Sequence, residues 1–302
     1  MSPSAGLPEA FRLSPLGEGR FVAPNMGDPG SRDVVYGGQL LSQMILASGQ
    51  VASTKEVASI HTIFARSATV ALPVEIDVDV IHDGRSFGSQ SVTVHQGDRV
   101  CAQALILRRA DGPDLIRHQP TMPEVDGPHR SPATGQVGLL APGSEIRVEG
   151  GVDTWDPDGP VGPAELAVWV RLPAIDDDPV LAQALLAYGT DGFLIGTALR
   201  PHAGFGQNMA HRSLATGVVS HTLTFHERVE VGTWLLMAQE SPYAGRGVSY
   251  GRSHVFSEDG RLIASFVQES MIKDAAPTPP TPPTPNPISE SEPEPEPVSP
   301  PS

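Results

Sequence analysis

The amino-acid sequence predicts an α+β protein built from two copies of one unit, each with a central buried helix wrapped by an antiparallel sheet. Three observations support this fold class. Two apolar segments resemble each other at a spacing of 140 residues, runs of alternating apolar and polar residues follow each segment, and tight-turn signals separate those runs. Apolar residues on nearly every side are typical of a buried helix, and a period of two is typical of a strand with one wet face.

The two predicted helices cover residues 40–49 and 180–189, which read LLSQMILASG and VLAQALLAYG. Aligned at the spacing of 140, Gln43 meets Gln183. An internal repeat of this kind indicates two structurally related units. We therefore expect the two helices to occupy equivalent places in the two halves.

The strands predicted after the first helix begin with residues 74–80, where Val and Ile alternate with acidic residues. Turn signals at 83–85 and 96–98 separate this run from further strand-like runs at 92–94 and 100–107. Glycine-containing turns between alternating runs favour antiparallel hairpins.

The second half repeats this order. Short strand-like runs at 146–148 and 167–172 open it, before the second helix. The strands expected after that helix cover residues 220–225, 234–240, 250–256 and 262–271. At spacings of 160 to 162 residues, strand and turn residues of the two halves coincide, so the strands repeat as the helices do.

Proline and glycine mark the divisions of the chain. Residues 277–302 hold 12 of the 31 prolines and no aromatic residue. Such a composition cannot bury enough apolar surface to offset its ordering entropy. The expected organisation is an N-terminal extension at 1–14, an N-terminal domain at 15–110, a linker at 111–144, a C-terminal domain at 145–274 and a disordered Pro/Glu-rich tail at 275–302.

Composition excludes several classes of function. Twenty basic and 35 acidic residues leave a net charge of −15, which disfavours nucleic-acid binding by phosphate neutralisation. The lone cysteine, Cys101, leaves no intramolecular disulfide and no cysteine-based zinc site, and its neighbours predict a buried thiol. No run reaches the ~18 apolar residues of a membrane-spanning helix, and no signal-peptide pattern opens the chain. We therefore expect a soluble, cytoplasmic protein.

Six short segments carry a family resemblance. They are residues 35–39 (VYGGQ), 83–87 (DGRSF), 115–119 (LIRHQ), 187–191 (AYGTD), 220–226 (SHTLTFH) and 264–269 (ASFVQE). In this order and spacing they resemble the acyl-CoA thioesterase II family, whose chains are two fused hotdog domains. The resemblance implies hydrolysis of acyl-CoA to free fatty acid and CoA by general-base activation of water, without a metal or an organic cofactor. Homo-oligomers through hotdog sheet edges are common in such folds, and this point stays open.

Asp191 matches the catalytic aspartate of that family. It ends an apolar helix, where a carboxylate lacks the favourable dipole interaction of a helix start, and such a locally unfavourable placement indicates a functional constraint. The alternative interpretation is a turn residue before Gly192. At the spacing of 140, Asp191 aligns with Val51, so the sequence predicts one site of this type per chain.

Gln268 matches the glutamine that helps to hold the attacking water in the family. Its amide interrupts an apolar strand and aligns with Ile106 at a spacing of 162, so this polar residue also occurs in one half alone. The alternative is an outward-facing strand residue, because the neighbouring Glu269 indicates that one face of the strand is wet.

The third member of the family's set is a strand hydroxyl, but Val218 occupies the matching position. In a regular strand, Ser220 and Thr222 share a face with Val218. We therefore predict that Ser220 supplies the hydroxyl, with Thr222 as the second choice.

The developing oxyanion of the reaction needs backbone N–H donors. Gly37 and Gly38 open the first buried helix, and glycine permits close approach where a helix N-terminus favours negative charge. We predict that this pair supplies the donors; a packing role is the alternative.

Two other functions stay open. The valine at position 218 leaves room for a non-catalytic hotdog protein that binds acyl thioesters. A hotdog hydratase or dehydratase is less favoured, because neither predicted helix opens with the paired His and Asp that this chemistry expects.

Overall fold

The computed structural model describes residues 9–27, 33–51, 55–133, 140–175 and 177–275. The first half of the chain forms β1 (Ser14–Gly17), β2 (Arg20–Ala23), α1 (Gly37–Val51), β3 (Glu56–Phe64), β4 (Val74–Asp83), β5 (Phe87–Gln96) and β6 (Arg99–Arg109). The second half forms β7 (Glu145–Val148), β8 (Glu165–Arg171), α2 (Pro179–Thr190), α3 (Leu194–Leu199), β9 (Leu214–Phe225), β10 (Trp234–Gly245), β11 (Val248–Ser257) and β12 (Leu262–Asp274). Short 3₁₀ turns lie at Glu9–Phe11, Glu149–Gly151 and Gln207–Met209.

These strands form one antiparallel sheet in the described residues, in the order β1-β2-β4-β5-β6-β3-β9-β12-β11-β10-β8-β7. The order is equivalent in both halves: β3 and β9 pair at the centre, the last strand of each half (β6 or β12) lies next to them, and the other strands follow outward in reverse chain order. The two halves of the chain therefore contribute equivalent halves of a single sheet.

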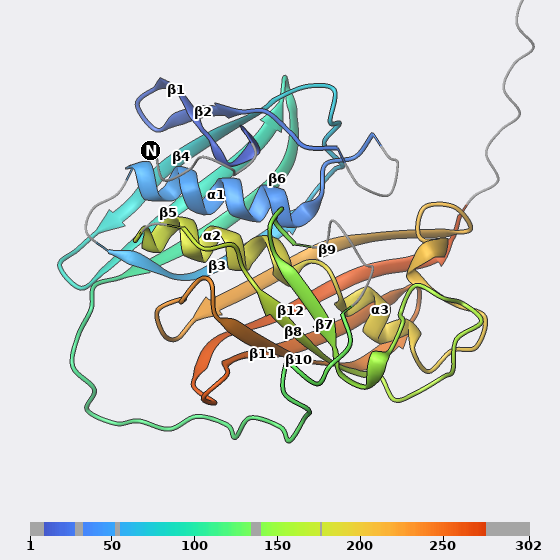
Figure 1. Cartoon of the computed structure of the whole chain (residues 1–302). Coiled ribbons are helices and arrows are strands. Elements are labelled where there is room, and N and C mark those ends of the chain that lie inside the picture. Colours follow the sequence, from blue (N-terminus) through green and yellow to red (C-terminus); the bar gives the residue numbers. More distant parts are fainter. Residues whose placement is uncertain (1–8, 28–32, 52–54, 134–139, 176, 276–302) are drawn as a thin grey trace, which may run out of the picture.

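The helices α1 and α2 lie side by side against this sheet (Figure 1). They touch through polar as well as apolar groups, since Ser42 Oγ donates a hydrogen bond to the Ala184 carbonyl oxygen at 2.7 Å. Asp178 caps the start of α2 by accepting from the Leu181 N–H at 3.0 Å, and Pro179 follows at the first helical position, which needs no donor. Apolar side chains of both helices and of both half-sheets form one continuous core.

The structure confirms both predicted helices and each predicted strand, with longer bounds. The sequence pattern missed β3, the edge strands β1 and β2, and α3. In β3 four consecutive residues, Val57 to Ile60, are buried, so the period of two is interrupted there. An alternation-based prediction does not detect such a strand.

Residues 111–133 of the predicted linker run along the outside of the second half-sheet (Figure 1). Hydrogen bonds attach them there: the Gln119 side chain donates to the Gly260 carbonyl and accepts from the Leu262 N–H, and Trp169 Nε1 donates to the Asp126 carbonyl at 2.8 Å. The predicted tail lies outside the described residues apart from residue 275.

Cys101 is buried, as the sequence predicted, and burial raises the pKa of its thiol. None of the helices in the described ranges has both the length and the apolar composition needed to cross a membrane.

Candidate active site

Asp191 lies directly after the last residue of α2 and is 8% exposed. One carboxylate oxygen, Oδ2, accepts a hydrogen bond from the backbone N–H of Gly38 at 3.0 Å. The other oxygen, Oδ1, is buried and has no hydrogen-bond partner among the described residues. A buried oxygen of this kind is costly unless a further donor, such as a water or substrate proton, occupies the space beside it.

The start of α1 explains how a carboxylate is tolerated at the end of α2. Gly37 and Gly38 open α1, so the carboxylate of Asp191 lies at a helix N-terminus contributed by the other half of the chain. The dipole of α1 favours negative charge there. A Cβ on Gly37 would come within 2.8 Å of Asp191 Oδ2, and one on Gly38 within 2.2 Å of the Tyr188 carbonyl oxygen. Gly38 is required because its close neighbour is backbone, whereas the close neighbour of Gly37 is the tip of the Asp191 side chain.

Burial raises the pKa of Asp191 from 3.8 to about 7, and the hydrogen bond from Gly38 opposes this shift only in part. The carboxylate is therefore divided between its charged and neutral forms near neutral pH. A general base is most effective when its pKa lies near the working pH. Asp191 has the protonation behaviour that proton abstraction from water requires.

Asp191 opens onto a cavity of about 580 Å³ between the two halves. Its wall includes the start of α1, the end of β3, the start of β9 and part of α3. The residues that line it include Gly37, Arg66, Asp191, Asn208, Arg212, Thr216 and Val218. The cavity lining thus combines apolar side chains, which suit an acyl chain, with one carboxylate and two arginines.

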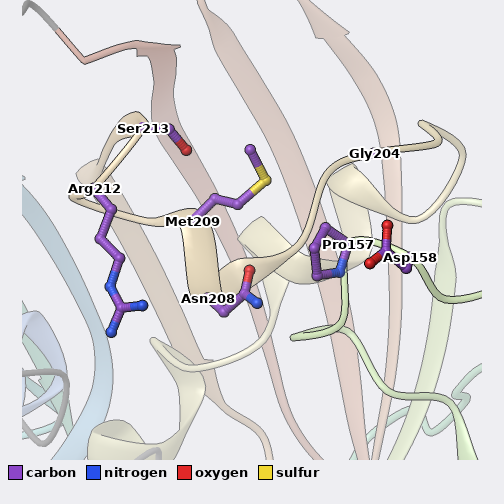
Figure 2. A pocket seen from close by; sticks show the side chains of 7 residues that line it. All are labelled: Pro157, Asp158, Gly204, Asn208, Met209, Arg212 and Ser213. Carbon is purple, nitrogen blue, oxygen red and sulfur yellow. The ribbon is translucent and has the colours of Figure 1, made fainter.

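A second, smaller cavity of about 320 Å³ adjoins the first and shares Asn208 and Arg212 with it. Figure 2 shows Asp158 on the far side of this cavity from Arg212. The two cavities therefore meet at the segment that precedes β9, where Arg212 borders both.

Gln268 lies on the inner face of β12 and is 1% exposed. Its Nε2 donates a hydrogen bond to Ser270 Oγ at 2.9 Å, and its Oε1 is buried without a partner among the described residues. The outward-facing alternative for Gln268 was wrong, whereas Glu269 does face outward. Gln268 is not among the residues that line the cavity.

His221 is a buried residue of β9 that faces Gln268 across the sheet. The two residues pair across β9 and β12, and the His221 ring stacks on Phe266 with centroids 5.6 Å apart. Burial lowers the pKa of His221 to about 4, and the backbone of Thr190 offsets this only in part. His221 is therefore a buried, neutral imidazole on the strand position opposite Gln268.

The expectation that Ser220 and Thr222 share a face with Val218 was wrong, because β9 contains a bulge. Ser270 pairs with Val218 and Glu269 with Ser220, so Val219 is an extra residue. One extra residue moves all later side chains to the other face of the sheet. The Ser220 hydroxyl instead donates to Glu269 Oε2, and the Thr222 hydroxyl lies 3.3 Å from His61 Nδ1.

Two hydroxyls that the sequence interpretation missed lie on the inner face instead. Thr216 lines the cavity and is 4% exposed, with Oγ1 3.4 Å from His211 Nε2. Ser270 is 1% exposed and bonds to Gln268. Thr216 precedes Val218 by two residues, so an alternation that starts before the bulge would have found it.

In the first half of the chain, buried polar side chains occupy the place that corresponds to the surroundings of Asp191. Arg108, 2% exposed, donates from Nη1 to Ser48 Oγ at 2.9 Å and from Nη2 to the Lys55 carbonyl oxygen. Lys55 Nζ in turn contacts Asp83 Oδ1 at 2.6 Å. Because this buried guanidinium and its partners occupy the place that corresponds to the end of α2, the asymmetry expected from Asp191 and Val51 extends to the surroundings of the site.

Comparisons with known proteins agree on one family. The profile of the acyl-CoA thioesterase N-terminal domain matches residues 26–109, and that of the acyl-CoA thioesterase C-terminal domain matches residues 118–272. The chain is 28% identical to acyl-CoA thioesterase 2 of Haemophilus influenzae, over 79% of this chain and 87% of that protein. It is also 28% identical to human acyl-coenzyme A thioesterase 8, over 87% of each chain.

Solved structures support the same relationship. A tesB protein of Mycobacterium avium subspecies paratuberculosis superposes with a TM-score of 0.73 at 26% identity, covering 87% of this chain and 97% of its own. The acyl-CoA thioesterase II TesB2 of Mycobacterium marinum has a TM-score of 0.72 at 25% identity, covering 90% and 98%. The fold is the hotdog type found in thioesterases. The chain therefore belongs to the acyl-CoA thioesterase II family, a family of thioester hydrolases.

Proposed function

We propose that this chain hydrolyses acyl-CoA thioesters to a free fatty acid and CoA, with Asp191 as the general base. The observation that carries the proposal is the Asp191 carboxylate: it is buried at the cavity, burial raises its pKa to about 7, and its Oδ1 has no partner among the described residues. A water molecule beside Oδ1 would donate a hydrogen bond to this oxygen, and Asp191 could then remove the proton of that bond.

Asp191 takes one proton from the water, and the water oxygen forms a bond to the thioester carbonyl carbon. The carbonyl oxygen becomes an oxyanion, which collapses and breaks the carbon–sulfur bond. Protonated Asp191 then returns the proton to the departing sulfur. The products are the carboxylic acid and the thiol of CoA.

Gln268 is proposed to hold the attacking water together with a hydroxyl. Its buried amide, with Oε1 lacking a described partner, supports this role. Thr216 on the cavity wall replaces Ser220 and Thr222 as the candidate hydroxyl that contacts the water, because the latter two have partners on the outer face.

Gly37 and Gly38 are proposed to have different roles. The Gly38 N–H donates to Asp191, which supports a role in holding the carboxylate rather than the oxyanion. Gly37 lines the cavity, and its N–H stays the predicted oxyanion donor. Arg66 and Arg212 on the same wall are proposed to bind the phosphates of CoA, since arginine recognises phosphate by paired hydrogen bonds.

We further propose that the chain is a double hotdog, with domains at 15–110 and 145–274 joined by the linker at 111–144. The mirrored strand order and the central pairing of β3 with β9 support this division. Pairing of further copies at the sheet edges, β1 and β7, and a cytoplasmic location stay predictions.

Thiol release from short, medium and long acyl-CoAs tests the proposal, with the wild type and Asp191→Asn assayed side by side. We expect turnover on at least one chain length and a loss of about 100-fold or more in the variant. No turnover on any chain length would favour the acyl-thioester-binding alternative. Equal turnover in both proteins would leave the reaction in place and remove Asp191 from it.

A further inference from the structure

The inner face of the β9–β12 pair places Ser270 directly opposite Val218. Val218 occupies the position where the family resemblance expects a hydroxyl, and it cannot hydrogen-bond. We propose that Ser270 takes over one task of that hydroxyl: it holds the side-chain amide of Gln268 in position. This proposal rests on the proposed function, in which Gln268 holds the attacking water.

The hydrogen bond between the two side chains carries the argument. Gln268 Nε2 donates to Ser270 Oγ at 2.9 Å, and both residues are 1% exposed. Within the described residues, the Gln268 side chain makes this hydrogen bond and no other. Because the amide nitrogen is directed toward Ser270, Oε1 is directed away from it. Ser270 therefore determines the orientation of the amide.

The strand register explains why Ser270 can supply a hydroxyl near position 218. Residues on one face of a strand recur at every second position, so Gln268 and Ser270 are neighbours on the inner face of β12. The extra residue Val219 keeps Val218 on the inner face beside Ser270 and turns Ser220 outward. The bulge that removes Ser220 from the site thus leaves Ser270 as the hydroxyl next to Gln268.

The first half of the chain provides an internal comparison. Its strand β3 has the same irregularity, with Val57 opposite Arg108 and Ile60 opposite Ile106. Val57, Arg108 and Ile106 correspond there to Val218, Ser270 and Gln268. The half without the catalytic carboxylate therefore lacks both members of the Gln268–Ser270 pair. A serine needed solely for strand packing would not have to be confined to the half of the chain that contains Gln268 and Asp191.

The first test compares Ser270→Ala with wild type in the thiol-release assay. Loss of one hydrogen bond to the amide predicts a fall in kcat of about tenfold with KM nearly unchanged. Ser253→Ala is the matched control, because Ser253 is also an inner-face serine, 2% exposed, on the adjacent β11, and its hydroxyl bonds to a backbone carbonyl. We expect this control to retain wild-type kcat. Wild-type kcat in Ser270→Ala would overturn the proposal.

The second test asks whether Ser270 acts through Gln268. If it does, the double variant Gln268→Ala/Ser270→Ala loses no more activity than Gln268→Ala alone. Losses that multiply would contradict the proposal, because a general structural effect of Ser270→Ala would be independent of Gln268. Ser270→Cys, similar in size but a weaker acceptor, covers the case in which the alanine variant does not fold, and kcat is expected to fall there too.

The two proposals fail in different ways. If Asp191→Asn abolishes turnover while Ser270→Ala and Ser270→Cys are fully active, the general-base mechanism stands and the role of Ser270 is rejected. If Asp191→Asn is fully active, the proposed function fails first, whatever the serine variants do.

Discussion

The backbone N–H of Gly38 donates a 3.0 Å hydrogen bond to the Asp191 carboxylate across 153 residues of sequence. This bond joins the start of α1 in one half to the end of α2 in the other. It places a negative charge where the dipole of α1 is favourable, and burial at the same point raises the pKa of Asp191 to about 7. The surroundings of the Asp191 carboxylate are thus built from both halves of the chain.

The pH dependence of catalysis follows from this pKa. A general base acts in its deprotonated form, so kcat/KM is expected to rise with pH and to reach half of its plateau near the Asp191 pKa of about 7. Below that, it should fall about tenfold per pH unit. The measurement is a pH–rate profile with a thiol-release assay corrected for the pH response of its dye. A profile that is flat between pH 5 and 8 would exclude Asp191 as the base.

The same shift predicts an effect on stability. The folded-state pKa is about 7 and the ordinary value is 3.8, so between these values the native state binds the proton and the unfolded state releases it. Stability that is present below pH 3.8 is therefore lost as pH rises through 7. Asp191→Asn removes this loss and should be more stable than wild type at pH 8, by up to about 4 kcal/mol. Urea unfolding at pH 5 and pH 8 checks this; an advantage of the variant that does not grow with pH contradicts it.

The two glycines at the start of α1 should respond differently to alanine. In Gly37→Ala the new Cβ meets the tip of the Asp191 side chain at 2.8 Å, so kcat should fall while thermal stability changes little. In Gly38→Ala it meets the Tyr188 carbonyl oxygen at 2.2 Å, where backbone must move. We expect that variant to lose about 1–3 kcal/mol of stability. Equal melting temperatures for the two variants would refute the distinction.

The bulge in β9 predicts that Ser220→Ala and Thr222→Ala retain kcat within about twofold, since their hydroxyls bond on the outer face. Thr216→Ala, on the cavity wall, serves as the comparison and should lower kcat. A large loss in Ser220→Ala with full activity in Thr216→Ala would restore the assignment made from a regular strand.

Val218→Thr restores a hydroxyl next to Ser270 with almost no change of shape. In the wild type we expect a small effect on kcat, because Ser270 already holds Gln268. In the Ser270→Ala background the same substitution should recover several-fold of the lost kcat. Steady-state kinetics of the four proteins measure this; equal effects of Val218→Thr in both backgrounds would speak against a shared task.

Local sequence patterns predicted the repeated helices and most of the strands, and the family resemblance singled out Asp191 and Gln268, which the repeat showed to occur in one half alone. Periodicity is a property of neighbouring residues, so it identifies a buried helix or a half-wet strand without knowledge of the rest of the chain. It also indicated that an aspartate at the end of an apolar helix was out of place.

Only the tertiary structure decided what surrounds these residues. The helix end that accepts the Asp191 charge comes from the other half, and no local pattern encodes that contact. Val219 shifts the face of β9 by one residue, and a bulge depends on pairing with β12 rather than on the composition of β9. For the same reason only the pairing of β9 with β12 places Ser270, an ordinary strand residue in the sequence, opposite Val218.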